Sequence, residues 1–191
     1  MSNTATMMGL GASPAPLKIS DAFSTTLYTG ASGSTAQETI TNGIDLDGKG
    51  GLVWVKVRNS TIGHYLVDTE RGAGQFLQSN STSAETDNEY TISGFTSSGF
   101  TLGQSYSPYF SGGVWGANNY VSWVWRKSSK FFAIVEYTGT GAAQTISHSL
   151  NNEVGMILIK QTSTGAADWS VYHRSLGGTK KMVFENGDED K

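Results

Sequence analysis

The chain has 191 residues, no cysteine and a formal net charge of −3. The lack of cysteine excludes disulfide bonds, thiolate metal sites and cysteine nucleophiles, and the acidic balance gives no general attraction to nucleic acid. No apolar run approaches the roughly 20 residues that span a bilayer, so we expect neither nucleic acid nor a membrane as a partner. The composition, with 24 glycines and 15% charged residues, is typical of short strands joined by tight turns.

The N-terminal residues 1–19 are small and polar, with two prolines, and lack the basic start and apolar segment of a secretory signal. They fit either a flexible tail or an arm that becomes ordered against a neighbouring subunit. In the second case Met7, Met8 and Leu10 are its anchors. At the other end, residues 186–191 are acidic and are expected to form a solvated tail.

Between these ends, short apolar runs bounded by turn residues predict strands. Residues 52–57 are apolar on both faces except at Lys56, which predicts a central strand covered on both sides. We expect Trp54, Trp123 and Trp125 in the core. No segment shows helical periodicity. In chain order the predicted strands lie at residues 23–29, 36–41, 52–57, 65–68, 75–78, 89–92, 100–102, 120–126, 131–137, 144–147, 156–160, 170–172 and 181–184.

One open sheet of this width would curl or split, so two stacked sheets are expected. The fold prediction is therefore all-β: an antiparallel β-sandwich of jelly-roll type over residues 20–130. A partial second β module follows at residues 131–185.

The second module is predicted because the sequence starts again partway through. Tyr-Thr-Gly at residues 28–30 returns at 137–139, and the run Gly-Leu-Val-Trp-Val-Lys returns as Gly-Met-Ile-Leu-Ile-Lys. Other landmarks recur at a spacing of 104 to 109 residues, and the second copy stops about half finished. This organisation favours a modular surface protein over one built around a catalytic pocket. The longest matches pair residues 51–56 with 155–160, 64–68 with 169–173, and 72–74 with 177–178.

Metal binding has little support. The three histidines, His64, His148 and His173, have no partner at metal-ligand spacing, and the nearly matching places of His64 and His173 in the two copies favour a structural role. Residues 42–47 carry oxygen ligands in a Gly-rich loop, but they lack the full calcium-loop spacing. A plain turn is favoured there. We predict no metal site and no cofactor.

Catalysis is not predicted either. Glycoside hydrolysis needs two carboxylates across a cleft, whereas Glu38, Glu89 and Glu136 stand isolated in the sequence. The nucleophile elbow GxSxG and the phosphate-binding loop are absent. We therefore expect a protein that is not an enzyme, with polysaccharide cleavage as a weaker alternative.

Two groups of residues remain as candidate sites. Asp68 and Arg71 bracket a turn that an ion pair between them would fix; a charged sugar contact is the alternative. Tyr106, Tyr109 and Trp115 lie in a stretch rich in glycine and serine. Aromatic rings on loops stack on sugars or anchor a partner subunit, or they fold back onto the sandwich.

A set of short strings lies along the chain at residues 1–11, 51–56, 68–74, 94–96, 99–102, 120–127, 135–141, 145–150 and 169–177. Together these strings resemble a repeat module of tailed-bacteriophage virion proteins, common in marine and cyanobacterial phages. The resemblance implies a concanavalin-like β-sandwich in a tail fibre, head fibre or capsid decoration protein at the virion surface, with no catalytic motif. It implies other virion proteins as partners and a homo-oligomer, with a trimer favoured by analogy with phage fibres. The alternative function is a lectin module that binds a host-surface glycan.

Overall fold

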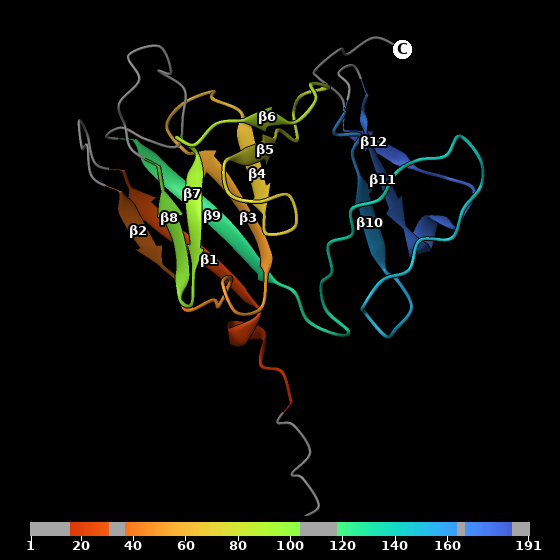
Figure 1. Ribbon diagram of the computed structural model, residues 1–191, viewed down its shortest axis with the longest axis horizontal. Coiled ribbons are helices and arrows are strands. Elements are labelled where there is room, and N and C mark those ends of the chain that lie inside the picture. Colours follow the sequence, from red (N-terminus) through yellow and green to blue (C-terminus); the bar gives the residue numbers. More distant parts are fainter. Residues whose placement is uncertain (1–15, 31–36, 104–117, 164–166, 185–191) are drawn as a thin grey trace, which may run out of the picture.

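The computed structural model describes residues 16–30, 37–103, 118–163 and 167–184 of the chain (Figure 1). These residues form antiparallel strands with only two short 3-10 turns, η1 (Ile19–Asp21) and η2 (Arg174–Leu176). The prediction of an all-β, sandwich-like fold is confirmed.

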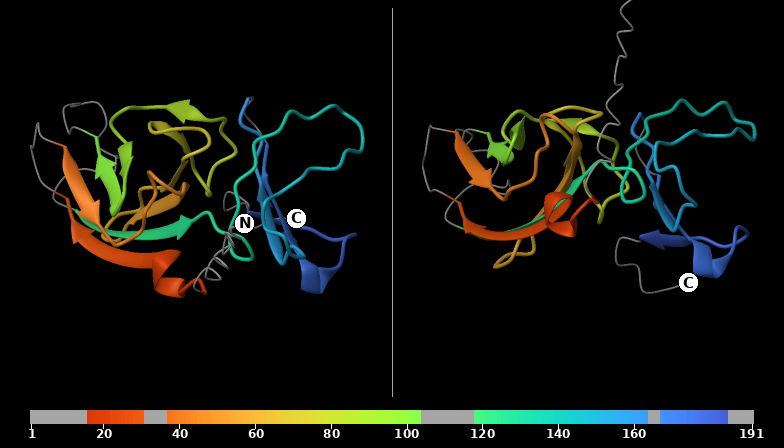
Figure 2. Two further views of the ribbon diagram at one scale, coloured as in Figure 1. Left: turned by 60° about the horizontal axis from the view of Figure 1, so that its bottom comes forward. Right: turned by 90° about the horizontal axis from the view of Figure 1, so that it is seen from below.

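The first module consists of two sheets that face each other, as the two views in Figure 2 show. The larger has the strand order β1-β9-β3-β4-β5-β6 and the smaller has the order β2-β8-β7. Their bounds are β1 (Phe23–Thr29), β9 (Asn119–Arg126), β3 (Gly51–Val57), β4 (His64–Asp68), β5 (Gln75–Leu77) and β6 (Thr86–Asp87), with β2 (Glu38–Thr41), β8 (Gly99–Leu102) and β7 (Ile92–Thr96) in the smaller sheet.

A hydrophobic core fills the space between these two sheets. Alternate residues of a strand point to opposite faces, so Val53 and Val55 of β3 point inward together and are both 0% exposed. Phe100 of β8, also 0% exposed, meets them from the smaller sheet. The remaining buried members are Ile40, Ile44, Leu46, Val57, Val67, Phe76, Ile92, Leu102, Tyr120 and Val124.

The second module is a three-stranded sheet with the order β10-β11-β12, and it packs against the outer face of the larger sheet. Trp169 of the second module is buried among Leu52, Leu66 and Leu77 of the first. The indole Nε1–H of Trp169 also donates a 2.8 Å hydrogen bond to the Gln78 carbonyl. The bounds are β10 (Met156–Ile159), β11 (Trp169–His173) and β12 (Met182–Phe184).

This packing confirms that β3 is a central strand covered on both faces. Trp54, Trp123 and Trp125, however, do not lie in the core between the two sheets. They lie on the outer face of the larger sheet and are partly buried, where Trp54 and Trp125 pack against the cluster that joins the modules.

Two predicted strands of the second copy are wrong. Residues 131–137 and 144–147 form no strand, apart from an isolated bridge between Ser128 and Phe132. Their counterparts in the first copy are β1 and β2, which pair with β9 and β8. Within the described part of the chain, the second copy has no counterpart of β8 or β9, so these segments have no neighbour with which to form ladder hydrogen bonds.

The first module departs from prediction at two smaller points. Residues 89–91 are not a strand, because β7 begins at Ile92 and Thr91 instead closes a turn by donating its backbone N–H to the Asn88 carbonyl (3.0 Å). Strand β6 has only two residues, both exposed, so it carries no apolar pattern from which it could be predicted.

Candidate functional site

Several predicted site residues lie outside the described residues. These are the loop aromatics and the anchors of the N-terminal arm, namely Tyr106, Tyr109, Trp115, Met7, Met8 and Leu10. The candidate site is therefore built from the residues that the structure places.

Asp68 and Arg71 form a buried ion pair at the end of β4. Arg71 Nε lies 2.6 Å from Asp68 Oδ2, and the two side chains are 8% and 7% exposed. Arg71 Nη1 also binds Glu85 Oε2 at 2.7 Å, and Nη2 donates to the Leu66 carbonyl at 3.1 Å. The guanidinium is thus shared between two carboxylates rather than bidentate to one, and it is fully engaged in fixing the turn.

The same Asp68 side chain caps the turn that follows β4, because its Oδ1 accepts the backbone N–H of Glu70 at 3.0 Å. In the second module His173 occupies the matching position, and its Nδ1 accepts the N–H of Ser175 at 3.3 Å. His173 therefore corresponds to Asp68, as the pairing of residues 64–68 with 169–173 in the sequence indicates. Each side chain therefore accepts a backbone hydrogen bond from the turn that follows its strand.

Several polar side chains that were considered for metal binding accept hydrogen bonds from nearby groups of the protein. Asn42 Oδ1 accepts the N–H of Ile44 at 2.9 Å, and Asp45 Oδ1 accepts that of Gly48 at 2.8 Å, as turn residues commonly do. His64 Nδ1 accepts a 2.8 Å hydrogen bond from Trp54 Nε1. Among the described residues, no group of three or more His, Cys, Asp or Glu side chains is placed to hold a metal ion.

The two modules share the same three-strand pattern in the same register. Leu52 of β3 faces Asp68 of β4, and the matching Met156 of β10 faces His173 of β11. The first backbone hydrogen bond of each pair is also the same: Thr69 N donates to Gly51 O at 3.0 Å, and Arg174 N donates to Gly155 O at 2.9 Å. The sequence repeat is therefore also a structural repeat, with β10, β11 and β12 corresponding to β3, β4 and β5.

Equivalent faces of the two modules meet at their interface. Leu158 of β10 packs in the cluster that joins the modules, as do its counterpart Trp54 and Leu66. Val171 of β11, the counterpart of Leu66, lies on the same strand face as Trp169 of that cluster. The opposite face of the second module is left open. Ile157 and Ile159 there are 39% and 40% exposed.

Among the strands that the structure describes, β10 pairs with β11 alone, so no described strand lies at its outer edge. Hydrogen-bonded and non-hydrogen-bonded pairs alternate in an antiparallel ladder. Since Gly155 bonds to β11, Ile157 and Ile159 do so too, and the N–H and C=O groups of Met156 and Leu158 face the open edge. Met156 is 51% exposed.

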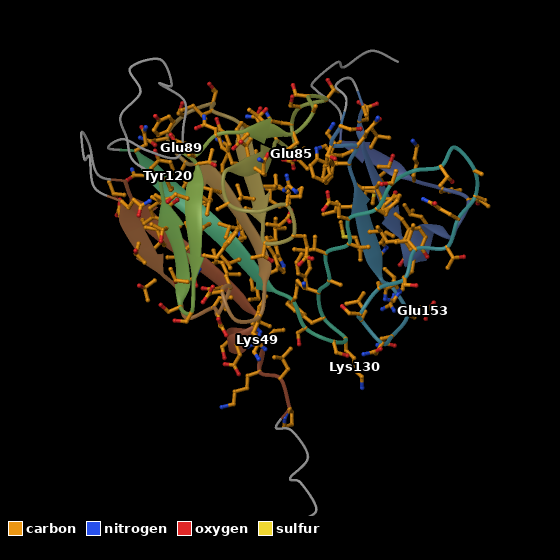
Figure 3. All side chains as sticks on the ribbon, viewed as in Figure 1. Lys49, Glu85, Glu89, Tyr120, Lys130 and Glu153 are labelled. Atoms are coloured by element: carbon orange, nitrogen blue, oxygen red, sulfur yellow. The ribbon has the colours of Figure 1, made fainter. Side chains whose placement is uncertain are left out.

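No charge interrupts this edge between residues 155 and 159. Lys160 follows directly, but its Nζ donates to the carbonyls of Thr82 (3.0 Å) and Ala167 (2.6 Å). Partial burial lowers the Lys160 pKa, while the charge of Asp168 opposes that shift. The ammonium is thus directed to the junction of the modules. Nearby, Glu85 donates its backbone N–H to the Thr162 carbonyl at 3.1 Å; Figure 3 labels Glu85 beside this junction.

The open edge and its adjoining face, made by Met156, Ile157, Leu158 and Ile159, are the candidate site, and we refer to them as the β10 surface. Sequence reasoning assigned these residues to a strand of an unfinished repeat but did not name them as a site. The sequence did contain a signal for this site, because the described part of the second copy has no counterpart of β8 or β9.

The comparisons place both modules in one family. The profile of a domain of unknown function, DUF7483, matches residues 18–191. The chain belongs to the DUF7483 family. The DUF7483 match covers the sandwich and the second module together and begins just before η1. The chain matches no functionally curated protein and no solved structure. Among the described residues of this DUF7483 protein, no helix is long and apolar enough to cross a membrane.

Proposed function

We propose that this DUF7483 protein is a non-enzymatic structural component of a tailed-bacteriophage particle, acting as a fibre or capsid decoration protein. The resemblance of its repeated strings to phage virion modules supports the proposal. The structural observation that carries it is the β10 surface, where an apolar strand lies at a sheet edge without charged residues to protect it. Such edges pair readily with other chains, and exposed apolar surface of this kind marks sites of association.

The expected partners are other virion proteins and further copies of the same chain, with a trimer favoured by analogy with phage fibres. Residues 1–19 are proposed as the arm that docks on the capsid or tail. Binding would depend on buried apolar area and backbone pairing rather than on any chemical step.

Gold labelling of purified phage particles that carry the gene tests this proposal. Antibodies against the purified protein are expected to label a defined part of the head or the tail. If neither labelling nor mass spectrometry finds the protein in purified particles, the proposal is refuted.

A deletion of residues 1–17 tests the role of the arm, since the DUF7483 match begins at residue 18. The shortened protein is expected to keep the circular dichroism spectrum and unfolding temperature of the full chain while being lost from the particles. Normal incorporation of the shortened protein would show that the arm is not the docking element.

A further inference from the structure

We propose that the β10 surface binds an extended strand donated by a different protein chain, antiparallel to β10 and with the alternating residue pattern of β9. The inference rests on the proposed function and names the kind of partner that the open module takes. The first module is the template, because it shows the same strand with its partner in place.

In that template, β9 lies beside β3 along its whole length. The two strands share seven residue pairs, from Gly51 with Arg126 to Val57 with Tyr120. The Lys127 N–H continues the ladder by donating to the Gly50 carbonyl at 2.8 Å. By the same alternation that applies to β10, the N–H groups of Leu52 and Trp54 point to β9. Their counterparts Met156 and Leu158 point to the open edge.

A glycine marks the close approach of the partner strand. A Cβ atom added to Gly51 would lie 2.1 Å from the Trp125 carbonyl of β9, so only glycine fits at that position. The second copy keeps a glycine at the matching Gly155, yet the nearest atom to a Cβ there would be Arg174 Nε at 4.0 Å. Nothing among the described residues requires glycine at this position, whereas a strand docked like β9 would require it.

The template also defines the chemistry of the donated strand. Val124 and Ser122 face Val53 and Val55 in the core of the first module, so the donated strand needs small or β-branched residues opposite Ile157 and Ile159. On its other face the template has aromatic residues. Trp123 and Trp125 pack their rings 6.2 and 6.3 Å from that of Trp54, the counterpart of Leu158.

A donated strand fits this surface better than a second β10. Strand β10 has four residues, so two β10 strands could share at most four pairs, against the seven between β3 and β9. A longer strand would also reach residues 133–137, which lie in no strand and whose counterpart β1 pairs with the far edge of β9. A single strand with the β9 pattern would therefore pair with β10 at one edge and with the counterpart of β1 at the other.

Binding of a fluorescent peptide tests the proposal. The peptide has the sequence of residues 118–127, which includes β9, and is titrated into the full chain while fluorescence anisotropy is measured. Saturable binding is expected. A matched peptide with N-methyl groups on Trp123 and Trp125 keeps every side chain but loses two backbone donors, and it is expected to bind about tenfold more weakly.

The protein variant Met156→Pro removes the N–H that faces the open edge, a position where proline is compatible with an edge strand. It is expected to weaken binding of the unmodified peptide about tenfold. The control is Leu27→Lys on β1, which lies at the edge of the larger sheet and is 60% exposed; this variant is expected to bind normally. Circular dichroism checks that both variants fold.

Three results would overturn the proposal: no saturable binding of the unmodified peptide, binding that is unaffected by both N-methylation and Met156→Pro, or binding that Leu27→Lys abolishes. A fourth result that would overturn the proposal comes from the oligomeric state of the full chain, measured by analytical ultracentrifugation. A homo-oligomer that Met156→Pro dissociates would identify a second copy as the occupant. Particle labelling does not depend on any of these outcomes, so the proposed function and this inference fail separately.

Discussion

The two modules contain the same three strands in the same register, yet the surroundings of their inner faces differ. In the first, Val53 and Val55 are 0% exposed beneath the smaller sheet, while their counterparts Ile157 and Ile159 are 39% and 40% exposed. The first module therefore shows what the strand pattern produces when its partners are present. The second shows that three strands persist without them, because one face of the small sheet is covered by the sandwich.

The two copies also separate the preference of a short sequence for β structure from the presence of a partner strand. Tyr-Thr-Gly occurs at residues 28–30 and at 137–139, but only the first copy lies in a strand that β9 extends into a sheet. The preference of a sequence for β structure depends strongly on its neighbours. The repeat thus contains an internal control in which similar residues have or lack a partner strand.

The largest expected difference between the modules concerns their turns. Arg71→Met would leave Asp68, 7% exposed, and Glu85 without their shared cation, which is expected to cost about 3–5 kcal/mol of unfolding free energy. Arg174→Met in the second module removes an exposed side chain that makes no ion pair among the described residues, so the expected change is within about 0.5 kcal/mol. Urea unfolding followed by circular dichroism measures both; equal losses would contradict the assignment of the buried network.

The next prediction compares matching positions on the two inner faces. Val55→Ala removes two methyl groups from a fully buried site and is expected to destabilise the protein by about 2 kcal/mol. Ile159→Ala removes more atoms, but from a side chain that is 40% exposed, and is expected to cost less than about 1 kcal/mol. Urea unfolding of the two variants measures which one loses more unfolding free energy. A greater loss for Ile159→Ala would mean that the second inner face is covered in solution.

Much of this organisation could be predicted from the sequence. The apolar run at residues 52–57 indicated a strand buried on both faces, and the repeat indicated which strands would recur. The sequence did not show that residues 131–137 and 144–147 would form no strand, because strand-like residues look alike with or without a neighbouring strand. The location of the three tryptophans also escaped prediction, since an alternating pattern does not say which face of a sheet meets a second module.

The candidate site was less predictable than the fold. The Asp68 and Arg71 ion pair could be proposed from spacing alone, whereas the participation of Glu85 depends on a contact across 14 residues. The β10 surface is defined by what is missing beside it, and local sequence patterns report only what is present. Its apolar residues look the same as those of a buried strand.

A smaller effect is expected at His64, in the first module only. Burial, followed by the nearby charge of Lys56, lowers the pKa of His64 below its ordinary 6.5. The neutral ring accepts the Trp54 hydrogen bond, so its stabilising contribution is present above pH 6.5 and is lost as the pH falls through the lowered value. The hydrogen bond is worth about 1 kcal/mol.

His64→Asn keeps an acceptor near Trp54 but cannot titrate, so the fall in unfolding free energy between pH 7 and pH 5 is expected to become shallower. His148→Asn, at an exposed position in the second module, is the matched control for replacing a histidine by asparagine. Unfolding curves across this pH range measure both. If the two variants gave the same profile, the role assigned to His64 would be wrong.

Amide hydrogen exchange, followed residue by residue by NMR, tests the open state of the β10 surface most directly. In the isolated protein the N–H groups of Met156 and Leu158 are expected to exchange on the order of 100-fold faster than those of Leu52 and Trp54, because only the latter are paired with a neighbouring strand. Equal protection at the two pairs of positions would show that β10 already has a partner, and the account of an open β10 edge would be contradicted.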